Sequence, residues 1–129
     1  MIQSIPQRVV TISVIGTGAQ AAVYYSYLSP VTGIRYTDSP TCDMQADEAT
    51  NILFVLDYQA TRQGWIVTGT SPHDGSPALE AVPGALQLSI LVIDPYIKMD
   101  TCQFYIHYRN ANGTEMQRDP QVGNVRPPM

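Results

Sequence analysis

The sequence predicts an all-β protein made of two antiparallel sheets packed face to face, and three observations lead to this prediction. Apolar residues alternate with a period of two along several stretches, as side chains do on the two faces of a strand. Ten prolines and nine glycines interrupt the chain at short intervals, as turns between many strands require. No long segment carries an apolar stripe at helical spacing.

The length of 129 residues fits one domain that can bury a core without disulfides. We expect residues 1–118 to form this single sandwich domain. Residues 119–129 contain three prolines and are expected to form an extended or loose C-terminal tail.

The first half of the chain holds three predicted strands. Residues 8–15 place alternate valine and isoleucine side chains on one face, and two glycines end the strand. Residues 21–28 are rich in tyrosine and valine and end at a Ser-Pro step. Residues 51–59 form a strong core strand, and its second face, with Leu53 and Val55, is more apolar than a solvated face needs to be.

The second half holds four predicted strands. Residues 65–70 follow a glycine at a spacing that suits a hairpin, and residues 71–84 form an irregular stretch rich in proline and glycine. Two apolar runs, residues 86–93 and 103–109, are read as neighbouring core strands. An Asn-Gly turn leads into residues 114–118. About seven strands at this length match an immunoglobulin-like sandwich.

The charge pattern argues against nucleic acid and membrane partners. Seven basic and eleven acidic residues give a net charge of -4, and the basic residues are scattered rather than clustered. The longest apolar runs are far shorter than the roughly 20 residues that span a bilayer. The N-terminus lacks the pattern of a secretory signal, so we expect a cytoplasmic protein.

Two cysteines, Cys42 and Cys102, flank Trp65 at a spacing that an immunoglobulin disulfide could have. Cys42 lies in a polar, turn-like segment, and no export signal is visible. We therefore expect two reduced thiols, with a disulfide as the alternative.

The motifs that resemble catalytic or cofactor sites fail their context tests. Residues 16–21 (GTGAQA) follow a strand as a dinucleotide fingerprint does, but a strand rather than a helix is predicted next. His73 and Asp74 lie near two serines without the separated elements of a triad. The histidines and cysteines lack the spacing of metal ligands. We predict no catalytic residue, cofactor or metal, and a protein that is not an enzyme.

The remaining indication of function is the composition of the predicted surface. The chain has few charges (14%), eight tyrosines and one tryptophan. Several apolar residues fall on predicted outer faces: Val9, Ile15, Leu53, Val55, Leu91 and Ile93. Such faces favour contact with another protein or self-association, unless the chain's own loops cover them.

The alternative is a small-molecule or carbohydrate-binding module that uses exposed aromatic residues. Trp65, Tyr105 and His107, or loop residues around His73, would form its stacking surface. The predicted contact surface thus combines six residues: Trp65, His73, Tyr105, His107, Leu53 and Val55.

Two segments, LVIDPYIK around Asp94-Pro95 and RDPQVGNVRPP around Asp119-Pro120, resemble the DP-EP family of uncharacterised bacterial proteins. This chain has Asp119 where the name of the family leads us to expect glutamate. The resemblance implies a bacterial source and a seven-stranded immunoglobulin-like sandwich with Greek-key connections. It implies no activity, cofactor or catalytic residue.

Overall fold

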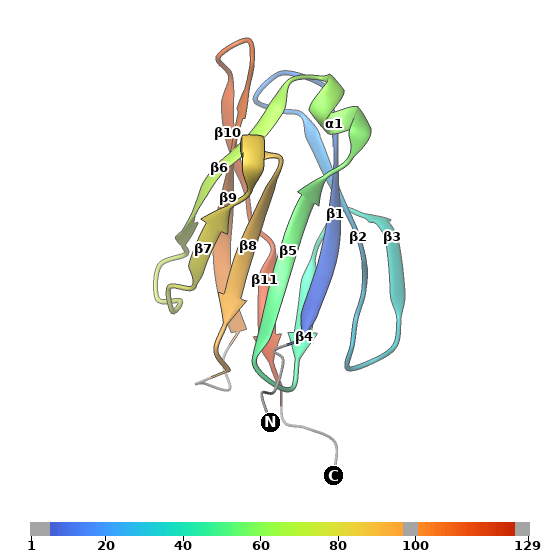
Figure 1. Cartoon of the computed structure of the whole chain (residues 1–129), viewed down its shortest axis with the longest axis vertical. Coiled ribbons are helices and arrows are strands. Elements are labelled where there is room, and N and C mark those ends of the chain that lie inside the picture. Colours follow the sequence, from blue (N-terminus) through green and yellow to red (C-terminus); the bar gives the residue numbers. More distant parts are fainter. Residues whose placement is uncertain (1–5, 97–100, 126–129) are drawn as a thin grey trace.

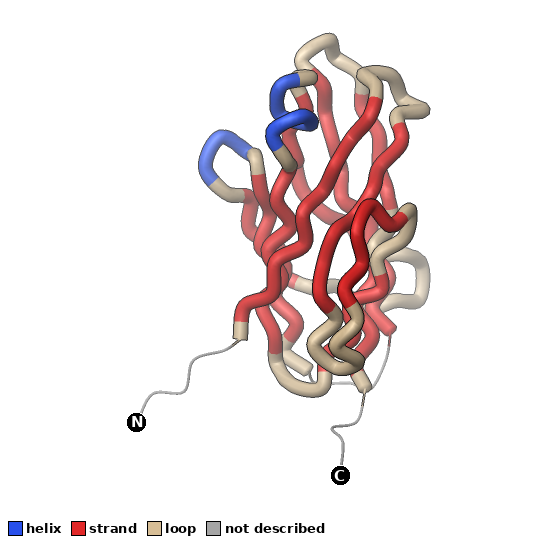
Figure 2. The backbone as a smooth tube through the Cα atoms, turned by 90° about the vertical axis from the view of Figure 1, so that its right-hand side faces the viewer, coloured by secondary structure: helices blue, strands red, loops and turns tan. Residues whose placement is uncertain are grey.

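The computed structural model describes residues 6–96 and 101–125, and this part of the chain is all-β, as the sequence predicts. Strands run roughly along the long axis, and the short helix α1 (Tyr58–Arg62) lies at one end (Figure 1). A single 3-10 turn, η1 (Ala85–Gln87), precedes β8 in the described chain. Strands account for most of the described chain (Figure 2). The described residues form eleven strands: β1 (Gln7–Ile15), β2 (Ala22–Leu28), β3 (Arg35–Ser39), β4 (Asp43–Ala46), β5 (Thr50–Leu56), β6 (Trp65–Pro72), β7 (Glu80–Pro83), β8 (Ser89–Asp94), β9 (Thr101–Asn110), β10 (Glu115–Arg118) and β11 (Gln121–Asn124).

The first sheet has six strands in the order β3-β2-β1-β5-β8-β7. Its neighbours are antiparallel except for the central pair, β1 and β5, which run parallel. Parallel neighbours need a long connection, and here β2, β3 and β4 lie between the two strands in sequence.

The second sheet is organised around β9, the longest strand. One edge of β9 pairs with β10 and then β11, while β6 pairs along the other edge. β4 extends this sheet by pairing in parallel with β11. The Asn-Gly turn predicted between β9 and β10 is confirmed, because Gly113 adopts a φ of 93° and its N–H donates to the Asn110 carbonyl at 2.8 Å.

A single hydrophobic core fills the space between the sheets. Alternate residues of each strand point inward, so that Phe54 of the first sheet meets Phe104 of the second, with ring centroids 6.0 Å apart and an edge-to-face geometry. The predicted alternation of residues 103–109 is confirmed, since Phe104, Ile106 and Tyr108 are buried.

The prediction of about seven antiparallel strands in an immunoglobulin-like arrangement is wrong in strand number and in direction. β3, β4, β7 and β11 lie outside the seven predicted strands and have only four or five residues each. A strand this short carries too little alternation to be recognised from sequence. The parallel pairs β1–β5 and β4–β11 further distinguish the two mixed sheets from a purely antiparallel sandwich.

The domain boundary predicted after Arg118 is also too early. β11 pairs with both β9 and β4, and the Val122 side chain is fully buried. The domain therefore extends at least to Asn124, while residues 126–129 lie outside the described residues. The proline-rich composition predicts an extended or loose tail, and the backbone between the prolines is indeed extended, but it pairs as a strand of the second sheet.

The sequence also predicts a turn at residues 16–21, two reduced cysteines and no membrane span. Residues 16–21 form a turn into β2, with Ala21 N–H donating to the Gly18 carbonyl at 3.0 Å, as predicted. Cys42 and Cys102 are buried thiols that are not joined by a disulfide. The described residues contain no helix with the length and apolar character that a membrane crossing requires.

Candidate functional site

The outer face of the first sheet carries an aliphatic row that crosses four adjacent strands. Val9 of β1 is in register with Leu53 of β5, Leu53 with Leu91 of β8, and Leu91 with Val82 of β7. Val9 and Val82 are 50% and 55% exposed, and the two leucines between them are partly buried. We call these four residues the aliphatic row.

Residues on either side of the aliphatic row make the surface more polar. Val55 lies beside Thr11 of β1 and Ser89 of β8, and Ile93 lies beside Asn51 of β5 and Glu80 of β7. The predicted contact residues Leu53 and Val55 thus both lie on this outer face, as the alternation of β5 requires. The chain's own loops leave the ends of the row exposed.

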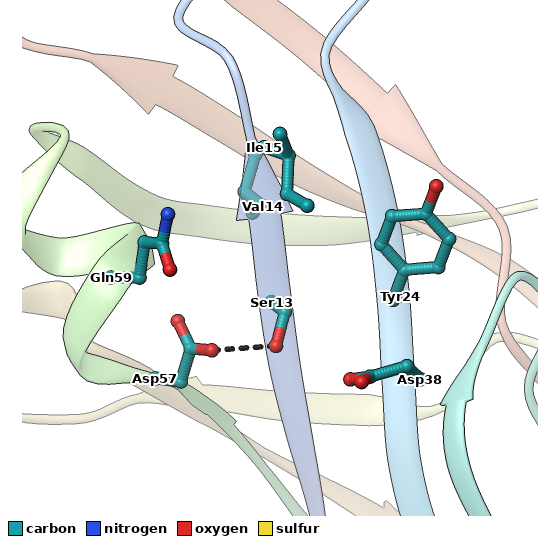
Figure 3. A pocket seen from close by; sticks show the side chains of 7 residues that line it. All are labelled: Ser13, Val14, Ile15, Tyr24, Asp38, Asp57 and Gln59. Carbon is teal, nitrogen blue, oxygen red and sulfur yellow. Dashed lines mark hydrogen bonds between the residues drawn. The ribbon is translucent and has the colours of Figure 1, made fainter.

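A hollow of about 440 Å³ opens on the same face beside α1 (Figure 3). Ser13 of β1 and Tyr24 of β2 are cross-strand partners at its floor, and Gln59 reaches it from α1. Asp57 and Asp38 lie on opposite sides of Ser13 in this view. Asp38 is held by its backbone, whose N–H donates to Ser26 Oγ at 3.0 Å.

Asp57 is the best-fixed polar group of this hollow. Its Oδ1 accepts from the Ala60 N–H at 2.8 Å and so caps the N-terminus of α1. Its Oδ2 accepts from the Ser13 hydroxyl at 2.5 Å. Both oxygens are therefore engaged in holding α1 against β1, which gives this carboxylate a structural role.

The outer face of the second sheet brings together three of the predicted residues. The His73 ring stacks on the Tyr105 ring, with centroids 4.1 Å apart and an interplanar angle of 14°. His107, two residues further along β9, shares a hydrogen bond of 2.7 Å between its Nε2 and Ser71 Oγ. His73 Nε2 lies 3.6 Å from an oxygen of the exposed Asp119, beyond hydrogen-bond length.

The Ser71–His107 pair contains the residue types of a nucleophile and its base, but it lacks the remaining parts of a catalytic site. No described carboxylate hydrogen-bonds the His107 ring to orient it. An open hollow of about 370 Å³ lies next to His107 and is lined by Thr68, Glu115 and Gln117 among others. The arrangement is suited to holding a polar molecule by hydrogen bonds.

Trp65 does not belong to either surface, so its assignment to the contact surface is wrong. Its side chain is fully buried, and its indole N–H donates to the Gly16 carbonyl at 2.9 Å. Its ring packs edge-to-face against Tyr108 at a centroid distance of 6.4 Å. The alternation of β6 places Trp65 and Val67 in the core and leaves Ile66 on the outer face.

Burial also removes several ionisable groups from any surface chemistry. Loss of contact with water raises the pKa values of Tyr25 and Tyr108, which face one another in the core, and of the Cys42 thiol. These groups stay neutral at neutral pH, so Cys42 is not a reactive thiolate. The described residues hold no group of three or more histidine, cysteine, aspartate or glutamate side chains that could bind a metal.

Two features of the surface escaped the sequence analysis. Val82 completes the aliphatic row, but it lies in the proline- and glycine-rich stretch that predicted only an irregular loop. Asp57 caps a helix of five residues, which is too short to leave a periodic pattern. The local signal for this cap is Asp57 itself, because aspartate is a preferred residue immediately before the first turn of a helix.

These observations describe an all-β protein of two mixed sheets whose candidate sites are the outer faces of the sheets. No protein-family model matches the chain, and no curated protein matches it either. A crystal structure of the inclusion body protein PixA from Burkholderia cenocepacia J2315 is similar over 95% of this chain and 98% of its own, with a TM-score of 0.54 and 8% sequence identity. A likeness at this identity shows a shared fold alone.

Proposed function

We propose that this protein acts through contact between protein surfaces, and that its partner is a second copy of the same chain. The observation that carries the proposal is the aliphatic row on the outer face of the first sheet. Four aliphatic side chains in register present a continuous apolar strip, and such strips usually mark association surfaces.

The surroundings of the row support an interface. Hydroxyl and amide side chains flank it, and an apolar centre with a polar edge is the usual layout of a protein contact. Fully burying one leucine or valine side chain contributes about 1.5–3 kcal/mol, so four partly exposed residues provide a useful driving force.

Charge favours a second copy as the partner. The aliphatic row itself carries no charge, so two identical faces can meet across a two-fold axis without like charges opposing one another at the centre. The description of PixA as an inclusion body protein is compatible with self-association and adds modest support.

Sedimentation velocity from 1 to 100 μM tests the proposal, with these concentrations chosen to span about two decades of Kd. We expect the wild-type chain to form a dimer or larger species that dissociates on dilution. Leu53→Lys and Val82→Lys each place a charge in the row and should yield monomer at every concentration. Circular dichroism of each variant verifies its fold.

Ile66→Lys is the matched control, because Ile66 is also a partly buried aliphatic residue on an outer face, but of the second sheet. It should associate as the wild type does. A wild-type chain that stays monomeric at 100 μM, or a control that dissociates as fully as Leu53→Lys, would exclude this contact surface.

A second candidate is a small-molecule or carbohydrate-binding module, favoured by the polar hollow beside His107 and by the Tyr105 ring that stacks on His73. It would use the outer face of the second sheet without Trp65. Glycan binding that is lost in Tyr105→Ala and retained in Ile66→Ala would support this function. Binding unaffected by Tyr105→Ala would argue against it.

The remaining expectations stay proposals. Membership of the DP-EP family rests on Asp94-Pro95 at the end of β8 and on Asp119-Pro120 immediately before β11. We also propose a non-enzymatic protein of the cytoplasm that works without cofactors or nucleic acid.

A further inference from the structure

β8 and β11 finish at the end of the sandwich opposite α1 (Figure 1). A cavity of about 160 Å³ is lined by residues at these strand ends. Its polar lining comes from three strands of both sheets, through Asp94, Cys102 and Asn124. Apolar side chains supply the rest of the wall: Pro77, Ala78, Leu79 and Pro95. The described lining is thus apolar apart from one carboxylate, one thiol and one amide.

Asp94 is almost fully buried, at 2% exposure, and only one of its two oxygens is engaged by the described residues. Oδ1 accepts from the Tyr96 N–H and from the Asn124 side-chain amide, both at 3.1 Å. Oδ2 has no hydrogen-bond partner among the described residues. No described basic side chain forms an ion pair with this carboxylate.

The described residues explain the burial of Oδ1 but not that of Oδ2. The bonds of Oδ1 are structural, because they fix the turn after β8 and tie β8 of the first sheet to β11 of the second. The burial of Oδ2 has no such explanation. A buried carboxylate normally has a cation or hydrogen-bond donors at both oxygens, because losing hydration without them is costly.

We propose that this cavity binds a small organic ammonium ion, with Asp94 as its counterion. The ammonium N–H groups would donate to Oδ2, and the hydrocarbon part would lie against Leu79 and the two prolines. The volume suits a compact group, since an apolar cavity of about 150 Å³ holds benzene. This site is separate from the aliphatic row and goes beyond the proposed self-association.

Other ligand classes fit the lining less well. A calcium ion takes about six to eight oxygen ligands, and the described lining of the cavity holds a single carboxylate. An anion would be repelled by Asp94. A purely hydrocarbon ligand would fill the apolar space but leave Oδ2 without a donor.

Isothermal titration of the full chain with benzylammonium and with the neutral, nearly isosteric benzyl alcohol tests the proposal. We expect the ammonium ion to bind at least about tenfold more tightly than the alcohol, as a charge-assisted hydrogen bond implies. Methyl NMR signals of Leu79 and Ala78 should shift on binding and so locate the ligand.

Asp94→Asn keeps the size of the side chain and removes its charge, so the preference for the ammonium ion should fall to about onefold. Asp119→Asn, at an exposed carboxylate, should keep the full preference. Should Asp94→Asn fail to fold, Ala78→Trp at an exposed part of the wall must abolish the Leu79 shift instead. Equal affinities for both ligands in the wild type, a preference retained in Asp94→Asn, or unshifted Leu79 methyls would overturn the proposal.

Discussion

The outer faces of the two sheets differ in chemistry although their inner faces build the same core. On the first sheet, four aliphatic side chains cross β1, β5, β8 and β7 in register. On the second sheet, His73 stacks on Tyr105, and Ser71 shares a hydrogen bond with His107. Among the described residues, the apolar surface of the first face has no partner, whereas the second face pairs some of its polar groups with one another.

This difference indicates where an external partner would gain most. Apolar surface gains by leaving water whatever the partner's identity, while polar groups that already pair with one another gain little from a new contact. The first sheet is therefore the better candidate for association. On the second sheet, the open hollow beside His107 is the candidate for binding a polar molecule.

The largest expected effect on stability is the difference between removing an inner and an outer aromatic side chain of the paired strands β6 and β9. Trp65→Ala should lower the free energy of unfolding by about 3–5 kcal/mol, because the indole is fully buried and its removal leaves a cavity. Tyr105→Ala should cost about 1 kcal/mol or less, because its ring is partly exposed. Urea unfolding measures both, and equal losses would contradict the assignment of the two faces.

The alternation of apolar residues in the sequence predicts part of the fold. Alternation identified the long strands and the inner face of residues 103–109, because burial on one side of a sheet imposes a period of two. It could not identify β4, β7 and β11, because each has four residues and shows the alternation at most twice. Nor does alternation show whether neighbouring strands run parallel, since that depends on connections distant in sequence.

The candidate site was predictable to a similar extent. Leu53 and Val55 were placed on an outer face because their neighbours in β5 are the stronger core residues. Trp65 was misassigned because an aromatic residue at the start of a strand is compatible with either face. The grouping of His73 with Tyr105 depends on a loop that brings two distant segments together, and no local pattern encodes it.

Alkaline pH should destabilise the protein through its inner face. Burial raises the pKa values of Tyr25, Tyr108 and Cys42 in the folded state, whereas the unfolded values lie near about 10 for tyrosine and about 8.5 for cysteine. The folded protein therefore holds more protons above those pH values, and the stability present below them is lost as pH rises. Each group contributes a slope of about 1.4 kcal/mol per pH unit.

Urea unfolding between pH 7 and 11 measures this slope, with the range set by the unfolded pKa values of about 8.5 to 10. Stability should be nearly constant from about pH 7 to 8 and then fall. Tyr25→Phe and Tyr108→Phe should each make the alkaline fall less steep. A slope unchanged in both variants would show that these core hydroxyls are not its cause.

A smaller effect is expected in the hollow on the outer face of the first sheet. Asp57→Ala removes the cap of α1 and the acceptor for Ser13, and should cost about 1–2 kcal/mol. Ser13→Ala should cost about 1 kcal/mol, and the double variant less than the sum because the two residues share one bond. Gln59→Ala is the control, with a change within about 0.5 kcal/mol, since its exposed side chain lies in the same hollow without a cap to lose.

The smallest effect is expected at the edge of the second outer face. Asp119 is 63% exposed and its carboxylate lies 3.6 Å from His73 Nε2, so their interaction is a solvent-screened pair rather than a hydrogen bond. Asp119→Asn should therefore change the free energy of unfolding by no more than about 0.5 kcal/mol and leave the stacking of His73 on Tyr105 intact. A loss above about 1 kcal/mol in urea unfolding, accompanied by coupling to His73→Gln in a double-mutant cycle, would show that this face depends on a specific ion pair. Asp119 is also the exposed carboxylate with which the buried Asp94 is compared in the ligand titrations. If Asp119→Asn leaves the stability unchanged, any difference between the two variants in ligand binding reflects the burial of Asp94.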